Sequence, residues 1–328
     1  MGSLWRGWGR MLVCAALAGA VLMPGAGWAL DYPTRTVRII VPFPAGGVPD
    51  VLARILAQGL SEKWGQPVVI ENKTGANTSL GAAFVARSAP DGYTILFTTD
   101  GTFILNPLLY KELPYSMKDL APVSLIATTV HALAINSSVP AKTVKEFVAL
   151  AKAKPNGYSY GTSGPASIQR ITMELFMRTE GISLLHVPYK GSGETTTALI
   201  AGEINSMING GLNIFPLLSN PSIRALAVSS TTRSRFAPDL PTMQEAGVAG
   251  YVSGGLSGVF TPAGVSAEIR DKIYRDIADL LKKPQIADAL SKSYFEPQGK
   301  NGEEFQAIIK QETERWRDVI TAAKISIQ

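Results

Sequence analysis

The sequence predicts an α/β protein of two domains, and three observations support this fold class. The chain has 328 residues, which is enough for two domains of ordinary size. Hydrophobic residues make up 46% of it and charged residues 17%, a balance typical of a chain that buries a core. Short β-branched runs alternate with amphipathic segments, and this order indicates a mostly parallel sheet with helices on both faces.

The N-terminal residues form a pattern typical of an export signal. Arg6 and Arg10 precede an apolar run, Met11–Met23, and Gly27-Trp28-Ala29 then places small residues at the two positions that a signal peptidase reads. This order predicts a secretory signal peptide that is cleaved after Ala29. The alternative is a membrane anchor, but the run is much shorter than the roughly 20 residues that span a bilayer. Cleavage would also remove Cys14, the one cysteine, so we expect no disulfide in the exported chain.

Strands and helices are expected to alternate through the first part of the remaining chain. The β-branched run 37–41 predicts a buried strand. The segment 51–64 predicts an amphipathic helix, because Leu52, Leu56 and Leu60 share one of its faces. Further elements follow the same reasoning: strands at 67–70 and 93–98, with a helix between them that ends near residue 88.

The second part continues this alternation before a helical C-terminal region. Thr143 and Glu146 form a capping-box pattern that opens a helix running to residue 154. The other expected elements are strands at 130–135, 158–161, 184–187, 204–208 and 224–228, and helices at 167–180 and 194–201. Three helices are expected after them, at 266–281, 284–291 and 302–322, with polar linkers between them.

Two strand-to-helix loops, 44–50 and 162–167, are rich in small residues and are candidate anion sites. A helix start exposes unpaired N–H groups and the positive end of the helix dipole, and small side chains let an anion approach the backbone. If the loops face each other across a cleft, they would bind the carboxylates of a small acid. Their small and polar residues include Ala45, Gly46, Gly47, Thr162, Ser163 and Ser167. The alternative is that glycines only shape turns there and that Asp50 only caps its helix.

The usual catalytic and metal-binding motifs are missing, so we expect neither an enzyme nor a metal or cofactor site. There is no Gly-x-Ser-x-Gly elbow, no phosphate loop, no Gly-x-Gly-x-x-Gly and no His-Glu-x-x-His. His131 and His186 are the only histidines, and both are expected to be structural. Asp100 ends a strand at an expected cleft edge, although turn chemistry would explain it equally well.

Nucleic-acid binding is not expected despite a net charge of +5. The basic residues do not form runs with interleaved aromatic residues, which nucleic-acid surfaces usually show. An exported protein would also not meet nucleic acid. The charge therefore indicates at most a mild preference for anionic small molecules.

Several motifs, in one order along the chain, resemble those of a known family. They are Val41-Pro-Phe-Pro-Ala-Gly-Gly47, Pro90-Asp-Gly-Tyr-Thr94, Asn106-Pro107, His186-Val-Pro-Tyr-Lys-Gly191, Arg224-Ala-Leu-Ala-Val228 and Pro262-Ala-Gly264. With these motifs the chain resembles the Bug (TctC-like) solute-binding proteins of tripartite tricarboxylate transporters.

The resemblance implies a type II periplasmic binding protein with a ligand cleft between two domains. Residues 1–29 would be the signal peptide, residues 30–130 with 251–328 domain one, and residues 131–250 domain two. Such a protein would be a periplasmic monomer that captures a small organic acid and delivers it to membrane permease subunits. The alternative is a sensor that presents the bound acid to a signalling partner. The resemblance also implies that backbone amides of the two small-residue loops meet the ligand carboxylate.

The chain departs from the family pattern near the expected cleft. Relatives usually have glycine and histidine where this chain has Ala166 and Arg170, and they often have aspartate where it has Asn209. These changes favour a dicarboxylate, aliphatic or aromatic, with Arg170 on its second carboxylate, and they disfavour amino acids. Arg170 could instead point to solvent. The predicted ligand-binding residues are Phe43, Ala45, Gly46, Gly47, Asp50, Asn77, Thr99, Thr162, Ser163, Ser167, Arg170, Tyr189 and Asn209.

Overall fold

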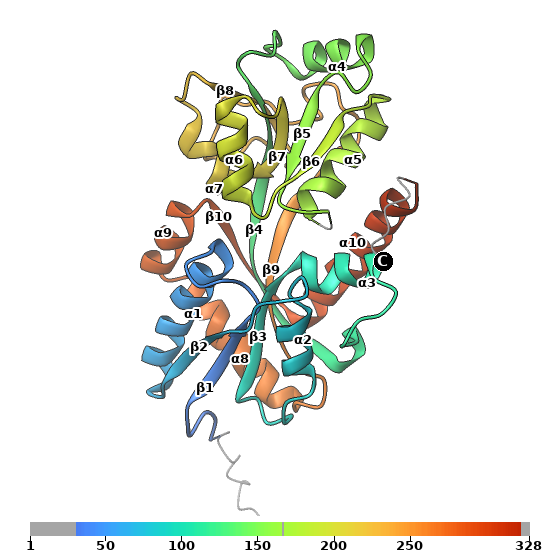
Figure 1. The fold of residues 1–328 in the computed structure, drawn as a ribbon. Coiled ribbons are helices and arrows are strands. Elements are labelled where there is room, and N and C mark those ends of the chain that lie inside the picture. The colour runs from blue at the N-terminus through green and yellow to red at the C-terminus, as the bar shows by residue number, and fades with distance from the viewer. Residues whose placement is uncertain (1–30, 166, 323–328) are drawn as a thin grey trace, which may run out of the picture. The chain divides into compact units, whose positions relative to one another are not determined.

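Two long antiparallel strands, β4 (Leu120–Asn136) and β9 (Gly254–Pro262), run through the middle of the fold (Figure 1). The computed structural model describes residues 31–165 and 167–322. Residues 33 to 322 belong to one compact unit. The predicted signal peptide, Cys14 and Ala166 lie outside the described residues.

One end of β4 and β9 belongs to a group of parallel strands. β1 (Val37–Val41) lies between β2 (Val68–Asn72) and β3 (Thr94–Thr99) and pairs with both in parallel, and β3 then pairs antiparallel with β9. The crossover helices are α1 (Val48–Trp64) and α2 (Ser79–Ala86). After β3 come a π-helix η1 (Gly101–Leu105), α3 (Asn106–Leu109) and a short 3-10 helix η2 (Met117–Asp119).

The other end of β4 pairs with a second group of strands. Here β4 pairs antiparallel with β7 (Ser206–Gly210) and β8 (Ile223–Val228), and β5 (Ser159–Thr162) pairs in parallel with β6 (Leu185–Pro188) and β7. The helices of this group are α4 (Val144–Ala153), α5 (Ile168–Glu180), α6 (Ser192–Ala201) and α7 (Gly211–Ile214), followed by the 3-10 helix η3 (Phe215–Leu217).

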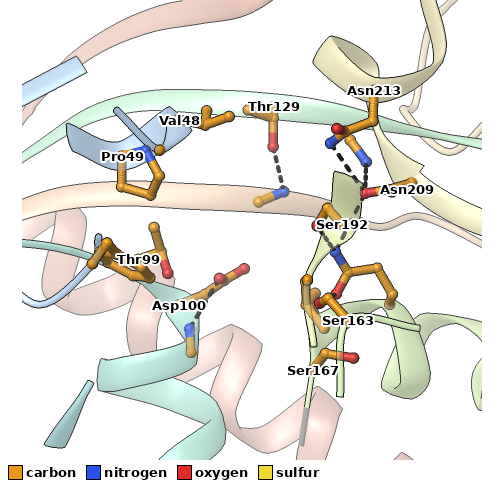
Figure 2. Close-up of a pocket in the computed structure, with 18 of the residues that line it drawn as sticks. Val48, Pro49, Thr99, Asp100, Thr129, Ser163, Ser167, Ser192, Asn209 and Asn213 are labelled. Carbon is orange, nitrogen blue, oxygen red and sulfur yellow. Dashed lines mark hydrogen bonds between the residues drawn. The ribbon is translucent and has the colours of Figure 1, made fainter. Parts of the chain in front are cut away.

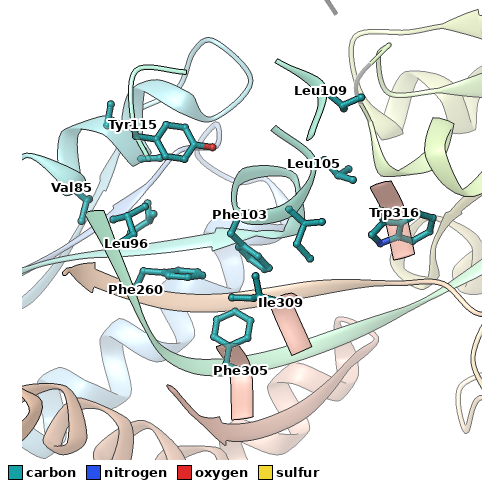
Figure 3. Packing of buried hydrophobic residues seen from close by; sticks show 14 of the residues in the cluster. Val85, Leu96, Phe103, Leu105, Leu109, Tyr115, Phe260, Phe305, Ile309 and Trp316 are labelled. Atoms are coloured by element: carbon teal, nitrogen blue, oxygen red, sulfur yellow. The ribbon is translucent and has the colours of Figure 1, made fainter. Parts of the chain in front are cut away.

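The C-terminal region returns to the first group of strands. It contains α8 (Ala267–Leu281), α9 (Pro284–Lys292), β10 (Phe295–Asn301) and α10 (Gly302–Ala322). Phe305 and Trp316 of α10 pack with Phe103 and Phe260 in one buried cluster, shown in Figure 3. The rings of Phe103, Phe260 and Phe305 lie 5.2 to 5.3 Å apart, the spacing of favourable aromatic pairs. None of the described helices is long and apolar enough to cross a membrane.

The structure confirms the α/β fold class but corrects the expected sheet. The sheet is mixed, because every pairing of β4 and β9 is antiparallel. The expected strand 130–135 is only the second half of β4, which begins at Leu120 and bends at two register shifts against β9. Such irregularities bend a long strand and increase its twist, so that one strand can serve both groups.

Two strands were not predicted: β9 lies in a segment to which no element was assigned, and β10 lies in an expected linker. The sequences of these strands do not indicate strands, because β9 carries three glycines and β10 carries a proline and a glycine, residues that are depleted in strands. The glycines are needed for close approach: a Cβ atom at Gly258 would lie 2.3 Å from the Phe305 ring, and one at Gly254 would lie 2.7 Å from the Thr129 carbonyl oxygen.

The starts of α1 and α4 each differ in one respect from the sequence prediction. Helix α1 begins at Val48 rather than at residue 51, since Pro49 in its first turn needs no hydrogen-bond acceptor there. At α4, Thr143 accepts a hydrogen bond from the Glu146 amide at 3.2 Å, as the capping box predicts. The Glu146 carboxylate, however, accepts from the Lys142 amide instead of the Thr143 amide.

Candidate functional site

A cavity of about 760 Å³ lies where loops of both strand groups meet β4 and β9. This volume is within the usual range for small-molecule sites. Val48 and Pro49 line it from the first turn of α1, and Thr99 and Asp100 line it from the end of β3 (Figure 2). Further segments that line it are Ser163–Pro165, Ser167–Gln169, Lys190–Gly193, Asn209–Asn213 and Gly255–Ser257.

The start of α1 opens on this cavity without a side-chain cap. Its N-cap residue is Gly47, which lines the cavity and makes no side-chain hydrogen bond to the first turn. The amide of Gly47 donates to the Pro44 carbonyl at 3.2 Å, which closes the loop. The first-turn amides of Val48 and Asp50 have no acceptor within the helix, so this helix start is a donor for an anion.

Asp50 supports this loop from behind and does not line the cavity. Its carboxylate is 1% exposed and accepts hydrogen bonds from the Gly46 amide, the Asn72 side chain and the Arg54 guanidinium, each at 2.8 Å. Desolvation raises the pKa of Asp50, but these hydrogen bonds and the charge of Arg54 outweigh it and hold the pKa below its usual value.

We predict that Asp50→Ala lowers the free energy of unfolding by about 3 kcal/mol, because it leaves three donors without their buried acceptor. Urea unfolding at pH 7 measures this change. Asp279→Ala is the matched control, since the Asp279 carboxylate pairs with Lys63 at 2.7 Å but is 57% exposed. That variant should lose no more than about 1 kcal/mol. Equal losses in the two variants would contradict a special role of Asp50 in the loop.

A second uncapped helix start, that of α6, opens on the same cavity. Its N-cap is Gly191, which makes no side-chain cap, and Ser192 and Gly193 follow in the first turn. The Glu194 carboxylate does not line the cavity and accepts a hydrogen bond from the Lys190 amide at 3.1 Å. This start was not predicted as an anion site, although the strand, the small-residue run and the helix repeat the pattern of loop 44–50.

In the second predicted loop, 162–167, polar groups form hydrogen bonds with one another. Ser167 caps α5 through its hydroxyl, which accepts from the Arg170 amide and donates to the Gly164 carbonyl at 2.8 Å. Thr162 is fully buried behind the loop, where its hydroxyl lies 2.8 Å from Nε2 of His186. Burial lowers the pKa of His186 to about 4, so this imidazole is neutral at pH 7.

A polar network centred on Gln169 joins the loops of the second group. The Gln169 carbonyl accepts from Ser163 at 2.9 Å, and its amide donates to Ser192 at 3.1 Å and to Asn209 at 3.3 Å. Asn213 adds a bond to the same Asn209 oxygen at 3.4 Å (Figure 2). The network connects three loops and fixes this wall of the cavity before any ligand enters.

The cavity brings together only part of the predicted site. The predicted residues that line it are Phe43, Gly47, Asn77, Thr99, Ser163, Ser167 and Asn209. The predicted residues that do not line it are Ala45, Gly46, Asp50, Thr162, Arg170 and Tyr189.

Arg170 does not line the cavity, because its guanidinium is engaged by neighbouring groups of its own loop and helix. The Arg170 guanidinium donates to the Pro165 carbonyl at 3.1 Å and lies 3.9 Å from the Glu174 carboxylate.

Three acidic or basic side chains that were not predicted as site residues also line the cavity. Asp100 is buried, and this burial, with Glu312 nearby, raises its pKa to about 7. His131 is also buried, which lowers its pKa to about 4, and its Nδ1 has no hydrogen-bond partner among the described residues. Lys190 is exposed and forms no ion pair within the described part of the chain. Of the three, only Asp100 had a sequence signal, its position at the end of a strand.

Two uncapped helix starts that open on one cavity are typical of a site that binds a small anionic solute. The chain belongs to the tripartite tricarboxylate transporter receptor (TctC) family, whose model matches residues 52–325. BugT of Bordetella pertussis is 32% identical to it over 298 residues, which cover 90% of this chain and 91% of that protein.

Solved structures show the same fold. A protein of R. palustris with adipate is 34% identical, has a TM-score of 0.82, and is matched over 90% of this chain and 99% of that one. MatC from Rhodopseudomonas palustris with bound malate is 28% identical, has a TM-score of 0.77, and is matched over 88% and 100% of the two chains. The chain is therefore a solute-binding receptor with the fold of periplasmic binding proteins, and the prediction that it is no enzyme is confirmed.

Proposed function

We propose that this receptor binds a small organic dicarboxylate in the 760 Å³ cavity and delivers it to the permease subunits of a tripartite tricarboxylate transporter. One observation carries the proposal: the uncapped starts of α1 and α6, at Gly47 and Gly191, open on this one cavity. The structures of relatives with adipate and with malate support a ligand that carries two carboxylates.

The donors suffice for useful affinity. A hydrogen bond to a charged group contributes roughly 1.5–3 kcal/mol net, and four of them would give a gross gain of about 6–12 kcal/mol. Association costs about 4 kcal/mol or more, so about 8 kcal/mol remains at most, and this upper limit corresponds to a micromolar dissociation constant. The two helix dipoles add a smaller favourable contribution for an anion.

The body of the ligand would lie among rings. Phe43, Tyr110 and Phe295 line the cavity, so an apolar stretch between the two carboxylates finds apolar contacts, whether it is aliphatic or aromatic. We expect residues 30–130 with 251–328 to move as one domain and residues 131–250 as the other. Closure would be driven by ligand contacts to both domains. We further expect export to the periplasm through the N-terminal signal and action as a monomer.

A thermal-shift screen tests the proposal. The purified exported chain is heated with aliphatic diacids from malonate to adipate, malate, citrate, phthalate, the matching monocarboxylates, and aspartate and glutamate. A ligand that binds only the folded state raises the melting temperature, so we expect the largest rise with a diacid. A rise confined to amino acids, or no rise with any organic acid, would contradict the proposed ligand class.

Lys190 should contribute to the choice between dicarboxylates and monocarboxylates. It is the one lysine or arginine that the described structure places along the cavity, and its ammonium group is free to meet a second carboxylate. We predict that Lys190→Met weakens diacid binding about five- to tenfold, the size of one partly solvated charge contact, and leaves the monocarboxylate unchanged. Calorimetric titration measures both affinities. Lys154→Met, outside the cavity, is the control, and an equal loss for both ligand types would show that Lys190 does not select the second carboxylate.

A further inference from the structure

Asp100 is a buried acid beside a cavity whose other features favour anions. It follows β3 directly and caps the π-helix η1, an irregular helix type that often marks functional sites. Its side chain is 5% exposed. Figure 2 shows its carboxyl group directed toward the side of the cavity that carries Ser192 and Asn209. The proposed function uses N–H donors and leaves this carboxyl group without a role.

The hydrogen bonds of Asp100 leave one oxygen weakly held. Oδ1 accepts from the Gly101 amide at 3.0 Å, whereas Oδ2 accepts from the Leu256 amide at 3.4 Å, which is long for such a bond. Asp100 forms no ion pair with any residue in the described ranges 31–165 and 167–322. An ionised Asp100 would therefore stand unpaired beside a bound anion, and Oδ2 is the atom available to carry a proton.

The charged groups around Asp100 also favour its neutral form. Behind it lies a second cavity of about 300 Å³, lined by Glu312 and Arg315 of α10. These two residues pair with each other at 3.1 Å, and the charge of Glu312 adds to burial in raising the pKa of Asp100 to about 7. From β4, His131 is neutral, since its pKa is lowered to about 4. From the α6 side, Lys190 is exposed to solvent.

We propose that Asp100 binds the organic acid as a neutral carboxyl group, with Oδ2–H donating a hydrogen bond to a ligand oxygen, so that capture of the ligand takes up one proton. This inference rests on the proposed function and specifies its chemistry. The proton comes from solvent and forms an O–H bond at Oδ2, and no other bond changes. A ligand oxygen at this place is accepted, whereas a ligand ammonium group would require the ionised carboxylate.

Calorimetric titration tests the proposal with the diacid that raises the melting temperature most. Titrations run from pH 6.5 to pH 9, where simple diacids are already ionised. We expect the affinity to fall with rising pH, approaching tenfold per pH unit above pH 7.5. Repeating the titration at pH 8 in buffers of different ionisation enthalpy should show uptake of close to one proton. Asp100→Asn keeps a donor for the ligand and an acceptor for the Gly101 amide, so its affinity should stay nearly constant over this range.

A second variant tests the proton uptake by changing Glu312, the charged residue that faces Asp100 from α10. Glu312→Gln removes the facing negative charge, so the fall in affinity should begin at a lower pH than in the wild type. Glu304→Gln is the control on the same helix, because Glu304 is exposed and 3.7 Å from Lys300. If no organic acid binds at any pH, the proposed function fails and this inference with it. Three results would overturn the role of Asp100 alone: an affinity that does not depend on pH, a heat of binding that does not change with the buffer, or an affinity that rises with pH.

Discussion

Gly191→Val should weaken binding of the organic acid by at least tenfold and leave the stability of the empty protein nearly unchanged. The backbone at Gly191 is extended, with φ −171°, a conformation that valine adopts readily. A Cβ atom there would meet no atom within 4 Å, so the new side chain strains nothing. It would, however, stand at the start of α6, where the ligand carboxylate must approach the first-turn amides.

The matching variant at the other helix start is Gly47→Val. It should also lose at least tenfold in affinity, and in addition some stability, since a Cβ atom at Gly47 would lie 3.1 Å from the Pro44 carbonyl oxygen. Calorimetric titration and urea unfolding of both variants separate the two effects. Wild-type affinity in a folded Gly191→Val protein would show that the start of α6 is not an anion site.

Asp100 should make the empty protein less stable as pH rises from about 4 to about 7. The pKa of Asp100 is 3.8 in the unfolded chain and about 7 in the fold, so between these values the folded state holds more protons and loses stability as pH rises. Above pH 7 the effect levels off. At 1.36 kcal/mol per pKa unit, the change between pH 4.5 and pH 8 is about 3 kcal/mol.

Comparison with Asp100→Asn isolates this effect from that of the histidines. His131 and His186 have lowered pKa values, so they act in the opposite direction and make the fold more stable as pH rises from about 4 to 6.5. Their contribution is the same in both proteins and cancels in the difference. We therefore expect the stability of Asp100→Asn relative to wild type to increase by about 3 kcal/mol between pH 4.5 and pH 8. A constant difference in urea unfolding would mean that Asp100 is ionised in the empty protein at neutral pH.

The sequence predicted those parts of the fold that depend on local pattern. The run 37–41 and loop 44–50 were found because a β-branched strand, a glycine turn and an amphipathic helix follow one another directly. Strand β9 was missed because its glycines are required by packing against residues far away in the sequence. Gly258, for example, leaves room for the Phe305 ring. Hydrophobic periodicity cannot reveal such a requirement.

Only part of the site was predicted, because contacts between distant residues also decide which side chains line the cavity. Asp100 accepts a hydrogen bond from the Leu256 amide, which belongs to the missed strand β9, so its position at the end of β3 alone could not distinguish a site residue from a turn residue. Arg170 was chosen because it replaces a histidine in the family pattern, but in the fold its guanidinium contacts Pro165 and Glu174 and does not line the cavity. A substitution pattern contains no information about these contacts.

The central claim is that one organic acid is held between the starts of α1 and α6, and a crystal structure with a bound diacid tests it most directly. We predict carboxylate oxygens about 2.7–3.2 Å from backbone nitrogens in the first turns that follow Gly47 and Gly191. A diacid whose carboxylates contact neither helix start, and lie instead on side chains such as Arg170, would contradict the claim.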